Sequence, residues 1–414
     1  MDVDPNTGLP MGLAPVHPNV GKKNEFKIGA IFPFRTWRSL PSLSTALLNI
    51  SISTGTLIVS LASLAVSIAV FLPIGAVKTV GDQGIRFVTG RRSSSDGASW
   101  GAIGGRRCVV INGASAGIGA ALAIEYAAPD THLVLIARDL RRLHEVAARV
   151  QSRGATVAVH SLDFFDPASL AKLQQLLQEV DTTAGGIDVA ISCTSVTGHR
   201  SDVLGPNLAH IPPTAAAAHS ASDGPQGSEY WGATTASRML QVNVAACQEF
   251  ILRSWELMKA PRRLQLQSGA TSSSNLVGPG PKIIVLSSST AFFTPATFAL
   301  YAAAKAYLYS LARSLQVASA PYGIGVVAVT PGFMETGLTE NMIRTGATCP
   351  RAILGDPRKL ARKIKRSEEA DELLVFYPVS QVWALFSARA LNPLLETLGL
   401  WAGAATGVAS WFFS

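Results

Sequence analysis

The chain has 414 residues, of which 48% are hydrophobic and only 15% are charged, and its mean hydropathy is +0.28. This length allows two or three domains, or one large domain with additions, and the composition is apolar enough to indicate contact with a membrane. The net charge of +8 is spread over flanks and helices rather than gathered in patches with aromatic residues. We therefore expect no nucleic-acid partner and favour contact with anionic lipid or phosphate. Four cysteines without paired or metal-ligand spacing indicate reduced thiols and no metal site.

The N-terminal part of the chain divides into three segments. Residues 1–38 lack hydrophobic periodicity, so we expect a disordered tail. No charged residue occurs from Ser39 to Val77, and Thr56–Val77 alone would extend about 33 Å as a helix, enough to cross a bilayer. We predict a transmembrane anchor over 39–78, with a buried soluble helix as the weaker alternative. The Ser-, Gly- and Arg-rich stretch 79–105 is typical of a linker.

The orientation of this anchor is not decided by charge, because basic residues flank it on both sides. A cleaved signal peptide is disfavoured, since the apolar run is too long and begins too far from Met1. The absence of a disulfide pattern favours a catalytic domain that faces the cytosol.

A strand, a glycine turn and a helix are predicted where residues 107–119 read RCVVINGASAGIG. Glycines let the backbone turn tightly and approach a pyrophosphate, whose charge is met by the N–H groups at the start of the following helix. The pattern alone is also typical of an ordinary turn between a strand and a helix. If it binds a dinucleotide, the residues expected to hold it are Gly113, Ser115, Gly117, Ile118 and Gly119.

A second strand–helix unit follows, with an apolar run over His132–Ala137 and a helical pattern through Arg153. Arg138 stands at the end of this strand, where a dinucleotide fold places the adenosine ribose. An arginine there suits a 2′-phosphate, which favours NADP(H) over NAD(H). The neighbouring Asp139 and the alternative of a solvated arginine leave this preference open. Asp163, after the third strand, can accept a hydrogen bond from the adenine amino group, although a simple turn aspartate is nearly as consistent.

The same alternation continues and predicts an α/β fold, a Rossmann-type doubly wound parallel sheet, over 106–372. Its further elements are a third strand over 156–161, a helix over 167–182, a strand over 187–193, a loop insertion over 199–229, a long helix over 234–259 that carries Asn243, a second polar insertion over 264–281 and a strand over 282–287.

The candidate catalytic groups lie after the Ser-rich end of this last strand. Tyr301 and Lys305 are four apart, so on a helix they share a face, and the ammonium favours the phenolate form of the tyrosine. The phenol can then pass a proton at neutral pH, while a strand-end serine hydrogen-bonds the same substrate oxygen. A Tyr-x-x-x-Lys pair alone is common as an exposed amphipathic pair. Here it follows a glycine turn suited to a nicotinamide dinucleotide, which indicates hydride-transfer chemistry.

With these motifs the chain resembles the short-chain dehydrogenase/reductase family, over about 106–376. The family's glycine turn begins with threonine, where this sequence has Asn112. The resemblance implies a catalytic tetrad, in which Ser288 binds the substrate oxygen and Asn243 holds a water that links the lysine to bulk solvent. The tetrad is Ser288, Tyr301, Lys305 and Asn243.

The resemblance also implies that Pro331 and Gly332 lie beside the nicotinamide and that Thr336 contacts its carboxamide. Tyr301 and Lys305 then also contact the cofactor. One motif departs from the family, because Ile191-Ser-Cys-Thr194 stands where Asn-Asn-Ala-Gly is usual. This departure keeps open a catalytically weak or inactive membrane-tethered scaffold or NADP(H)-sensing protein of the same fold.

The C-terminal part is expected to be loop-like over 335–356, then a basic helix, then an apolar segment over 373–414. This last segment has three tryptophans and no charge after Glu396, which favours membrane docking over a core helix or an oligomer interface. The whole combination resembles the endoplasmic-reticulum branch of the family, which includes microsomal hydroxysteroid dehydrogenases and 3-ketosphinganine reductases. It implies an endoplasmic-reticulum membrane protein that reduces a lipophilic ketone with NADP(H) as cofactor. The expected partners are the lipophilic substrate and membrane lipid, and a homodimer is also compatible with the sequence.

Overall fold

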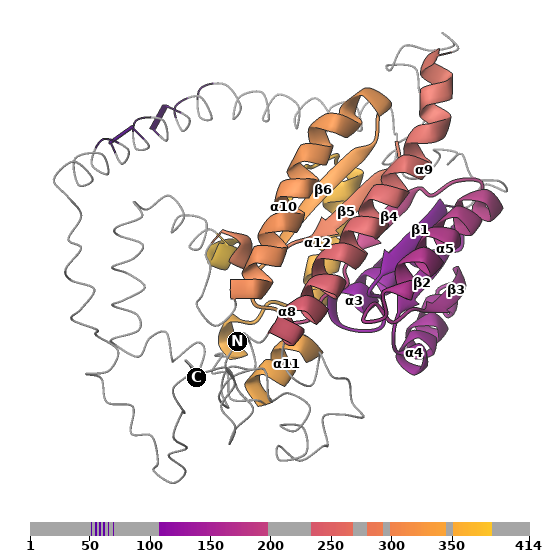
Figure 1. Cartoon of the computed structure of the whole chain (residues 1–414), viewed down its shortest axis with the longest axis horizontal. Coiled ribbons are helices and arrows are strands. Elements are labelled where there is room, and N and C mark those ends of the chain that lie inside the picture. Colours follow the sequence, from indigo (N-terminus) through magenta and orange to yellow (C-terminus); the bar gives the residue numbers. More distant parts are fainter. Residues whose placement is uncertain are drawn as a thin grey trace, which may run out of the picture. The chain divides into compact units, whose positions relative to one another are not determined.

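The protein is described by a computed structural model over residues 107–197, 233–267, 280–292, 299–344 and 351–382, with isolated positions between 51 and 69. These ranges hold a seven-stranded parallel sheet in the order β3-β2-β1-β4-β5-β6-β7 (Figure 1). The predicted α/β fold is therefore confirmed. The strands are β1 (Arg107–Asn112), β2 (Thr131–Ala137), β3 (Thr156–Ser161), β4 (Val189–Ser192), β5 (Lys282–Leu286), β6 (Gly325–Pro331) and β7 (Leu374–Tyr377).

Helices cover both faces of the sheet. On one face pack α3 (Gly117–Tyr126), α4 (Leu140–Gln151) and α12 (Pro357–Glu369), and on the other α5 (Ala168–Ala184), α9 (Cys247–Gln267) and α10 (Ala299–Ser319). Successive side chains of a strand point to opposite faces, so Val110 packs under α5 and α9 while Val109 and Ile111 pack under α3 and α4. This burial on both faces explains why the central strands β1, β4 and β5 are largely apolar rather than alternating.

The helix boundaries follow from local chemistry. Asp139 and Asp356 accept hydrogen bonds from backbone N–H groups in the first turns of α4 and α12, and Pro357 occupies the first position of α12. Helix α5 ends at Gly185, whose φ of +75° is the left-handed conformation that glycine adopts without strain.

The predicted insertion 264–281 and the predicted loop-like segment 335–356 are wrong in part, because each contains helical residues. The predicted long helix consists of α8 (Ala233–Leu240), a π-helical turn over Gln241–Ala246 and α9, and α9 continues to Gln267, inside the predicted insertion 264–281. The reason is that Leu264–Gln267 consists of good helix formers. The segment 335–356 contains α11 (Gly337–Arg344), which begins where the Thr336 hydroxyl accepts a hydrogen bond from the Thr339 N–H.

The sheet also extends into the predicted membrane-docking segment 373–414. Residues Leu374–Tyr377 pair with β6 as the edge strand β7. A short β-branched and aromatic run is a good strand, so these residues belong to the catalytic fold. The rest of that segment, from 383 onward, lies outside the described residues.

Other expectations fall on the same undescribed ranges: the tail 1–38, nearly all of the anchor 39–78, the linker 79–105 and the insertion 199–229. Of the anchor, single positions such as Ile58 and Leu61 are helical and exposed. Within the part of the chain that the structure describes, no helix is both long and apolar enough to cross a membrane.

Candidate active site

The glycine turn between β1 and α3 has a backbone that excludes side chains. Gly113 and Gly117 have φ of +88° and +55°, in the region that favours glycine. A Cβ added at Gly113 would lie 2.6 Å from the Thr194 nitrogen, and one at Gly119 would lie 2.1 Å from the Gly113 oxygen. Ala116, just before α3, provides no side-chain cap, so the first N–H groups of the helix are available to an anion. The turn thus fits the pyrophosphate of a dinucleotide.

A cavity of about 830 Å³ opens at the carboxyl ends of β1, β4, β5 and β6. This edge, where the strand order reverses between β1 and β4, is where doubly wound folds bind ligands. Twelve of the predicted site residues line it: Gly113, Ser115, Gly117, Ile118, Arg138, Asp163, Ser288, Tyr301, Lys305, Pro331, Gly332 and Thr336. Gly119 and Asn243 do not line it, since Gly119 lies beneath the glycine turn and Asn243 is fully buried.

Three of the four predicted catalytic side chains come from α10 and from the turn that follows β5. The Lys305 Nζ lies 5.6 Å from the centroid of the Tyr301 ring and donates to the Leu286 carbonyl oxygen at 3.1 Å. Lys305 is only 2% exposed, so its ammonium acts in a water-poor environment where electrostatic effects are strong. The Ser288 hydroxyl, also on the cavity wall, accepts from the Thr290 N–H at 3.2 Å.

Ser287 has a different task from its neighbour. Its hydroxyl donates to the Lys305 carbonyl oxygen at 2.7 Å and is buried, so it ties the catalytic helix to the end of β5. Together with the bond from Lys305 to Leu286, this contact fixes the position of α10 relative to the strand. The family resemblance singled out Ser288, but nothing in the sequence predicted the contact that Ser287 makes.

Asn243 is held in the π-helical turn between α8 and α9. Its side-chain oxygen accepts from the Val196 N–H at 2.8 Å, and its amide nitrogen donates to the Val196 carbonyl oxygen at 2.7 Å. Both bonds fix the loop after β4, and Val196 lines the cavity. The structure thus shows a positioning contact, and the role of Asn243 in holding a water stays a prediction.

The two departures from the family's motifs meet in space. The Thr194 hydroxyl donates to the Asn112 side-chain oxygen at 2.6 Å, and the Cys193 N–H donates to the Asn112 carbonyl oxygen at 2.9 Å. Asn112 is fully buried at the end of β1, so this pairing satisfies one of its polar atoms. The altered residues accommodate each other and leave β1 and β4 paired.

The part of the cavity that follows β2 is lined by two arginines, Arg138 and Arg142, and by Asp139. Both oxygens of Asp139 are engaged, one by the Arg142 backbone N–H at 3.0 Å and the other by the Arg142 Nε at 3.3 Å. The Arg138 guanidinium lies 5.3 Å from the centroid of the Phe165 ring, and within the described ranges it forms no ion pair. Arg138, Arg142 and Phe165 all line the cavity. Arg142 and Phe165 were not predicted as site residues. The four-residue spacing of Arg138 and Arg142 across the start of the helix could have indicated that Arg142 lies near the same site.

Gln381, in the helical residues 379–382 that follow β7, supports the predicted nicotinamide segment. Its Oε1 accepts from the Phe333 N–H at 2.8 Å, and its Nε2 donates to the Ile353 carbonyl oxygen. A Cβ added at Gly332 would lie 2.3 Å from the same Oε1, so a larger residue there would displace the Gln381 side chain. No local pattern in the sequence indicated this contact, which spans 48 residues.

Cys193, beside Lys305, is a partly buried thiol with a raised pKa. Burial raises the pKa of Cys193 to about 12, although the nearby Lys305 ammonium and a hydrogen bond from the Gly119 backbone act in the opposite direction. Burial likewise raises the pKa of Cys247. The thiolate is the nucleophilic form, so both thiols are protonated at physiological pH.

We therefore expect Cys193 to react with N-ethylmaleimide at pH 8 at least about a hundredfold more slowly than an ordinary thiol of pKa about 8.5. The rate should rise about tenfold per pH unit as the thiolate fraction grows. Peptide mass spectrometry after timed labelling measures it, with the urea-unfolded chain as the control. Rapid labelling of Cys193 in the folded chain would contradict the prediction, if the addition of NADPH blocks that labelling.

Comparison with known proteins agrees with this geometry. The family model for short chain dehydrogenase matches residues 107–205 and 271–346. An 11-beta-hydroxysteroid dehydrogenase A of Sesamum indicum is 27% identical over 305 residues, 69% of this chain and 73% of the relative. A 1-deoxy-11-beta-hydroxypentalenate dehydrogenase of Streptomyces exfoliatus is 26% identical over 257 residues, 60% and 74% of the two chains.

Among solved structures, levodione reductase superposes with a TM-score of 0.51 at 18% identity, covering 67% of this chain and 98% of that one. This likeness shows the fold. The matched segments contain the glycine turn, Ser288, Tyr301 and Lys305, which the structure gathers around one cavity suited to a nicotinamide cofactor. Over these matched segments the chain is similar to the oxidoreductases of the short-chain dehydrogenase family.

Proposed function

We propose that the protein is an NADPH-dependent reductase that converts a lipophilic ketone into an alcohol by tyrosine acid/base catalysis. The observation that carries this proposal is a single cavity with Tyr301, Lys305 and Ser288 at one end and the glycine turn with Arg138 at the other. The first group suits a carbonyl oxygen that gains a proton, and the second suits a phosphorylated dinucleotide.

Each residue has a definite task in this proposal. The N–H groups at the start of α3 would hold the pyrophosphate, and Arg138 would hold the 2′-phosphate. NADPH supplies the hydride when it is bound. The Tyr301 hydroxyl donates its proton to the substrate oxygen, which the Ser288 hydroxyl also hydrogen-bonds. The buried Lys305 ammonium stabilises the phenolate that this proton transfer leaves.

An apolar cavity wall and the names of two relatives support a lipophilic substrate. Phe333, Met334 and Leu338 form an apolar part of the cavity wall beside the predicted nicotinamide segment. Two relatives are named for a hydroxysteroid and a hydroxypentalenate, both largely hydrocarbon compounds. We further propose that the charge-free run in 39–78 anchors the protein in the endoplasmic-reticulum membrane, with the catalytic domain in the cytosol and substrate supplied from the bilayer.

The test is NADPH consumption by the detergent-solubilised protein with a panel of steroid, sphingoid and other lipid ketones. Turnover of one class supports the reductase and names its substrate. NADPH binding without turnover of any lipophilic carbonyl would overturn it in favour of a cofactor-sensing scaffold. Against that alternative stands the Asn112–Thr194 pairing, since the departure from the family's motif leaves the cofactor edge of the sheet intact.

Arg138 should determine the choice of cofactor. The variant Arg138→Ala is expected to raise KM for NADPH by about 10- to 100-fold, because a hydrogen bond to a charged group is worth about 1.5–3 kcal/mol. KM for NADH should change less than about threefold, since NADH has no 2′-phosphate. Steady-state kinetics with both cofactors measure this, with Arg141→Ala on the exposed side of α4 as the matched control. Equal effects on both cofactors would show that Arg138 does not contact the 2′-phosphate.

A further inference from the structure

Helix α12 presents a strongly basic surface away from the active site. It contains six cations and two acidic residues, so this one helix accounts for half of the chain's net charge of +8. Its apolar side, with Leu360 and Ile364, is buried in the core shared with α3 and α4. Its outer side exposes Arg358, Arg362 and Arg366, which recur every four residues and therefore form one stripe; Lys359 is exposed beside them.

The charge on this stripe is not neutralised within the described part of the chain. Lys363 and Lys365 point to backbone carbonyl oxygens, of Phe376 at 2.9 Å and Glu125 at 3.3 Å. Glu368 is buried and pairs with Arg107, so it does not serve the outer side. In the same ranges none of the four exposed cations forms an ion pair. Like charges at this spacing repel one another and destabilise a helix. A polyanion that binds the stripe relieves this repulsion and so stabilises the helix.

The surroundings of α12 favour a membrane as that polyanion. Leu373 and Val379, on either side of β7, are 53% and 55% exposed, and the sequence from 383 to 414 is apolar with three tryptophans. Basic residues next to exposed apolar ones are typical of surfaces that bind the lipid interface. A second copy of the chain fits poorly, because a two-fold axis through α12 would oppose cation to cation. Helix α12 also has no aromatic residue to stack on a nucleic-acid base.

We propose that the outer side of α12 docks on the anionic lipid headgroups of a bilayer. Gly355 lies two residues before the helix; its N–H donates to the Phe333 carbonyl oxygen and its carbonyl accepts from the Glu335 N–H, both at 2.8 Å. These contacts join α12 to a cavity wall, so docking fixes how the cavity faces the membrane. The inference does not rest on the reductase activity.

The test uses the full-length chain with a donor dye at Glu369→Cys in a Cys349→Ser background, mixed with vesicles that carry an acceptor dye on a headgroup. Vesicles of phosphatidylcholine are compared with vesicles containing 30% phosphatidylserine. Energy transfer should be higher with phosphatidylserine and fall in 0.5 M NaCl. The variant R358Q/K359Q/R362Q/R366Q should lose this gain, and its affinity for phosphatidylserine vesicles should drop on the order of a hundredfold or more, because each cation contributes about a factor of five.

The matched control is R141Q/R149Q/K172Q/R313Q, which removes the same charge from exposed positions on α4, α5 and α10. It should keep the gain, and both variants should bind NADPH like the parent, because none of these residues lines the cavity. An unchanged response of the α12 variant, or an equal loss in the control, would overturn the proposal. Loss of duplex RNA binding with an unchanged lipid response would assign the surface to nucleic acid instead.

Discussion

Tyr301→Phe is expected to lower kcat for ketone reduction by about a thousandfold while KM for NADPH stays within about threefold. General acid catalysis by a positioned side chain contributes about 10²- to 10⁴-fold, and phenylalanine removes the only proton that this side chain can donate. The ring remains, so the packing of α10 and the contact with the Lys305 ammonium are preserved. The loss should therefore appear in the chemical step and not in cofactor binding.

Single-turnover NADPH oxidation with the best ketone of the panel measures the chemical step directly. The control is Tyr307→Phe, on the same helix but exposed, with its hydroxyl on Gln248 and no place on the cavity wall. That variant should keep at least half of the parent's rate. A Tyr301→Phe protein that turns over like Tyr307→Phe would show that another group supplies the proton.

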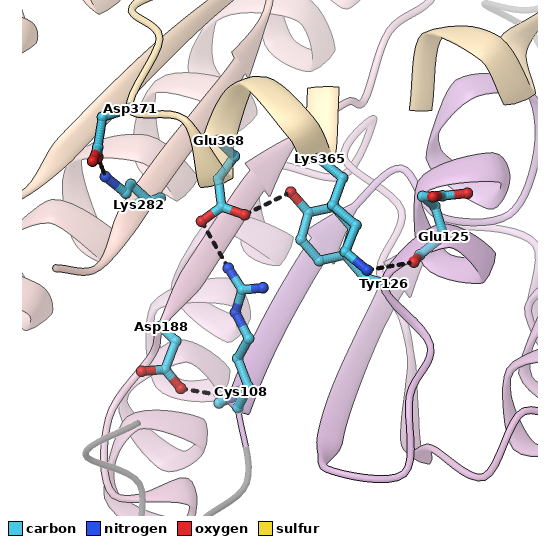
Figure 2. Close-up of polar contacts among 9 residues, drawn as sticks. Cys108, Glu125, Tyr126, Asp188, Lys282, Lys365, Glu368 and Asp371 are labelled. Carbon is cyan, nitrogen blue, oxygen red and sulfur yellow. Dashed lines mark hydrogen bonds and ion pairs between the residues drawn. The ribbon is translucent and has the colours of Figure 1, made fainter. Parts of the chain in front are cut away.

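Arg107→Leu is expected to lower the free energy of unfolding by about 3–5 kcal/mol, because it leaves a carboxylate buried without its partner. At the amino ends of the strands, the Arg107 Nη2 lies 2.7 Å from the Glu368 Oε1. Figure 2 shows Glu368 pointing toward Tyr126. The other carboxylate oxygen accepts from the Tyr126 hydroxyl at 3.4 Å, and Glu368 is 2% exposed. Burial, with the Glu368 charge second, holds the pKa of Tyr126 well above its usual range.

Denaturant unfolding of the full-length protein in detergent, followed by circular dichroism, measures this loss. Asp371→Asn is the control, because the neighbouring Lys282–Asp371 pair in Figure 2 has a carboxylate 75% exposed and should contribute less than about 1 kcal/mol. Asparagine also tolerates the positive φ of that position. The double variant Arg107→Leu/Glu368→Leu should recover part of the loss. Equal stabilities of Arg107→Leu and Asp371→Asn would show that the buried pair is not stabilising.

The alternation of strands and helices, the glycine turn and the Tyr301–Lys305 pair could all be predicted from the sequence alone. These features are local, because strand and helix periods repeat within a few residues and a turn that needs positive φ selects glycine at Gly113 and Gly117. Parallel strands, in turn, place their carboxyl ends at one edge, so local assignments were enough to expect a shared site there.

Which polar groups contact one another could be seen only in the folded chain. Arg107 and Glu368 pair across 261 residues, Thr194 and Asn112 across 82, and Asn243 and Val196 across 47. Each contact depends on strand register and helix packing, which no periodicity over a few residues encodes. The same holds for β7, whose short apolar run was assigned to the membrane segment because a buried edge strand and a lipid-facing stretch have the same composition.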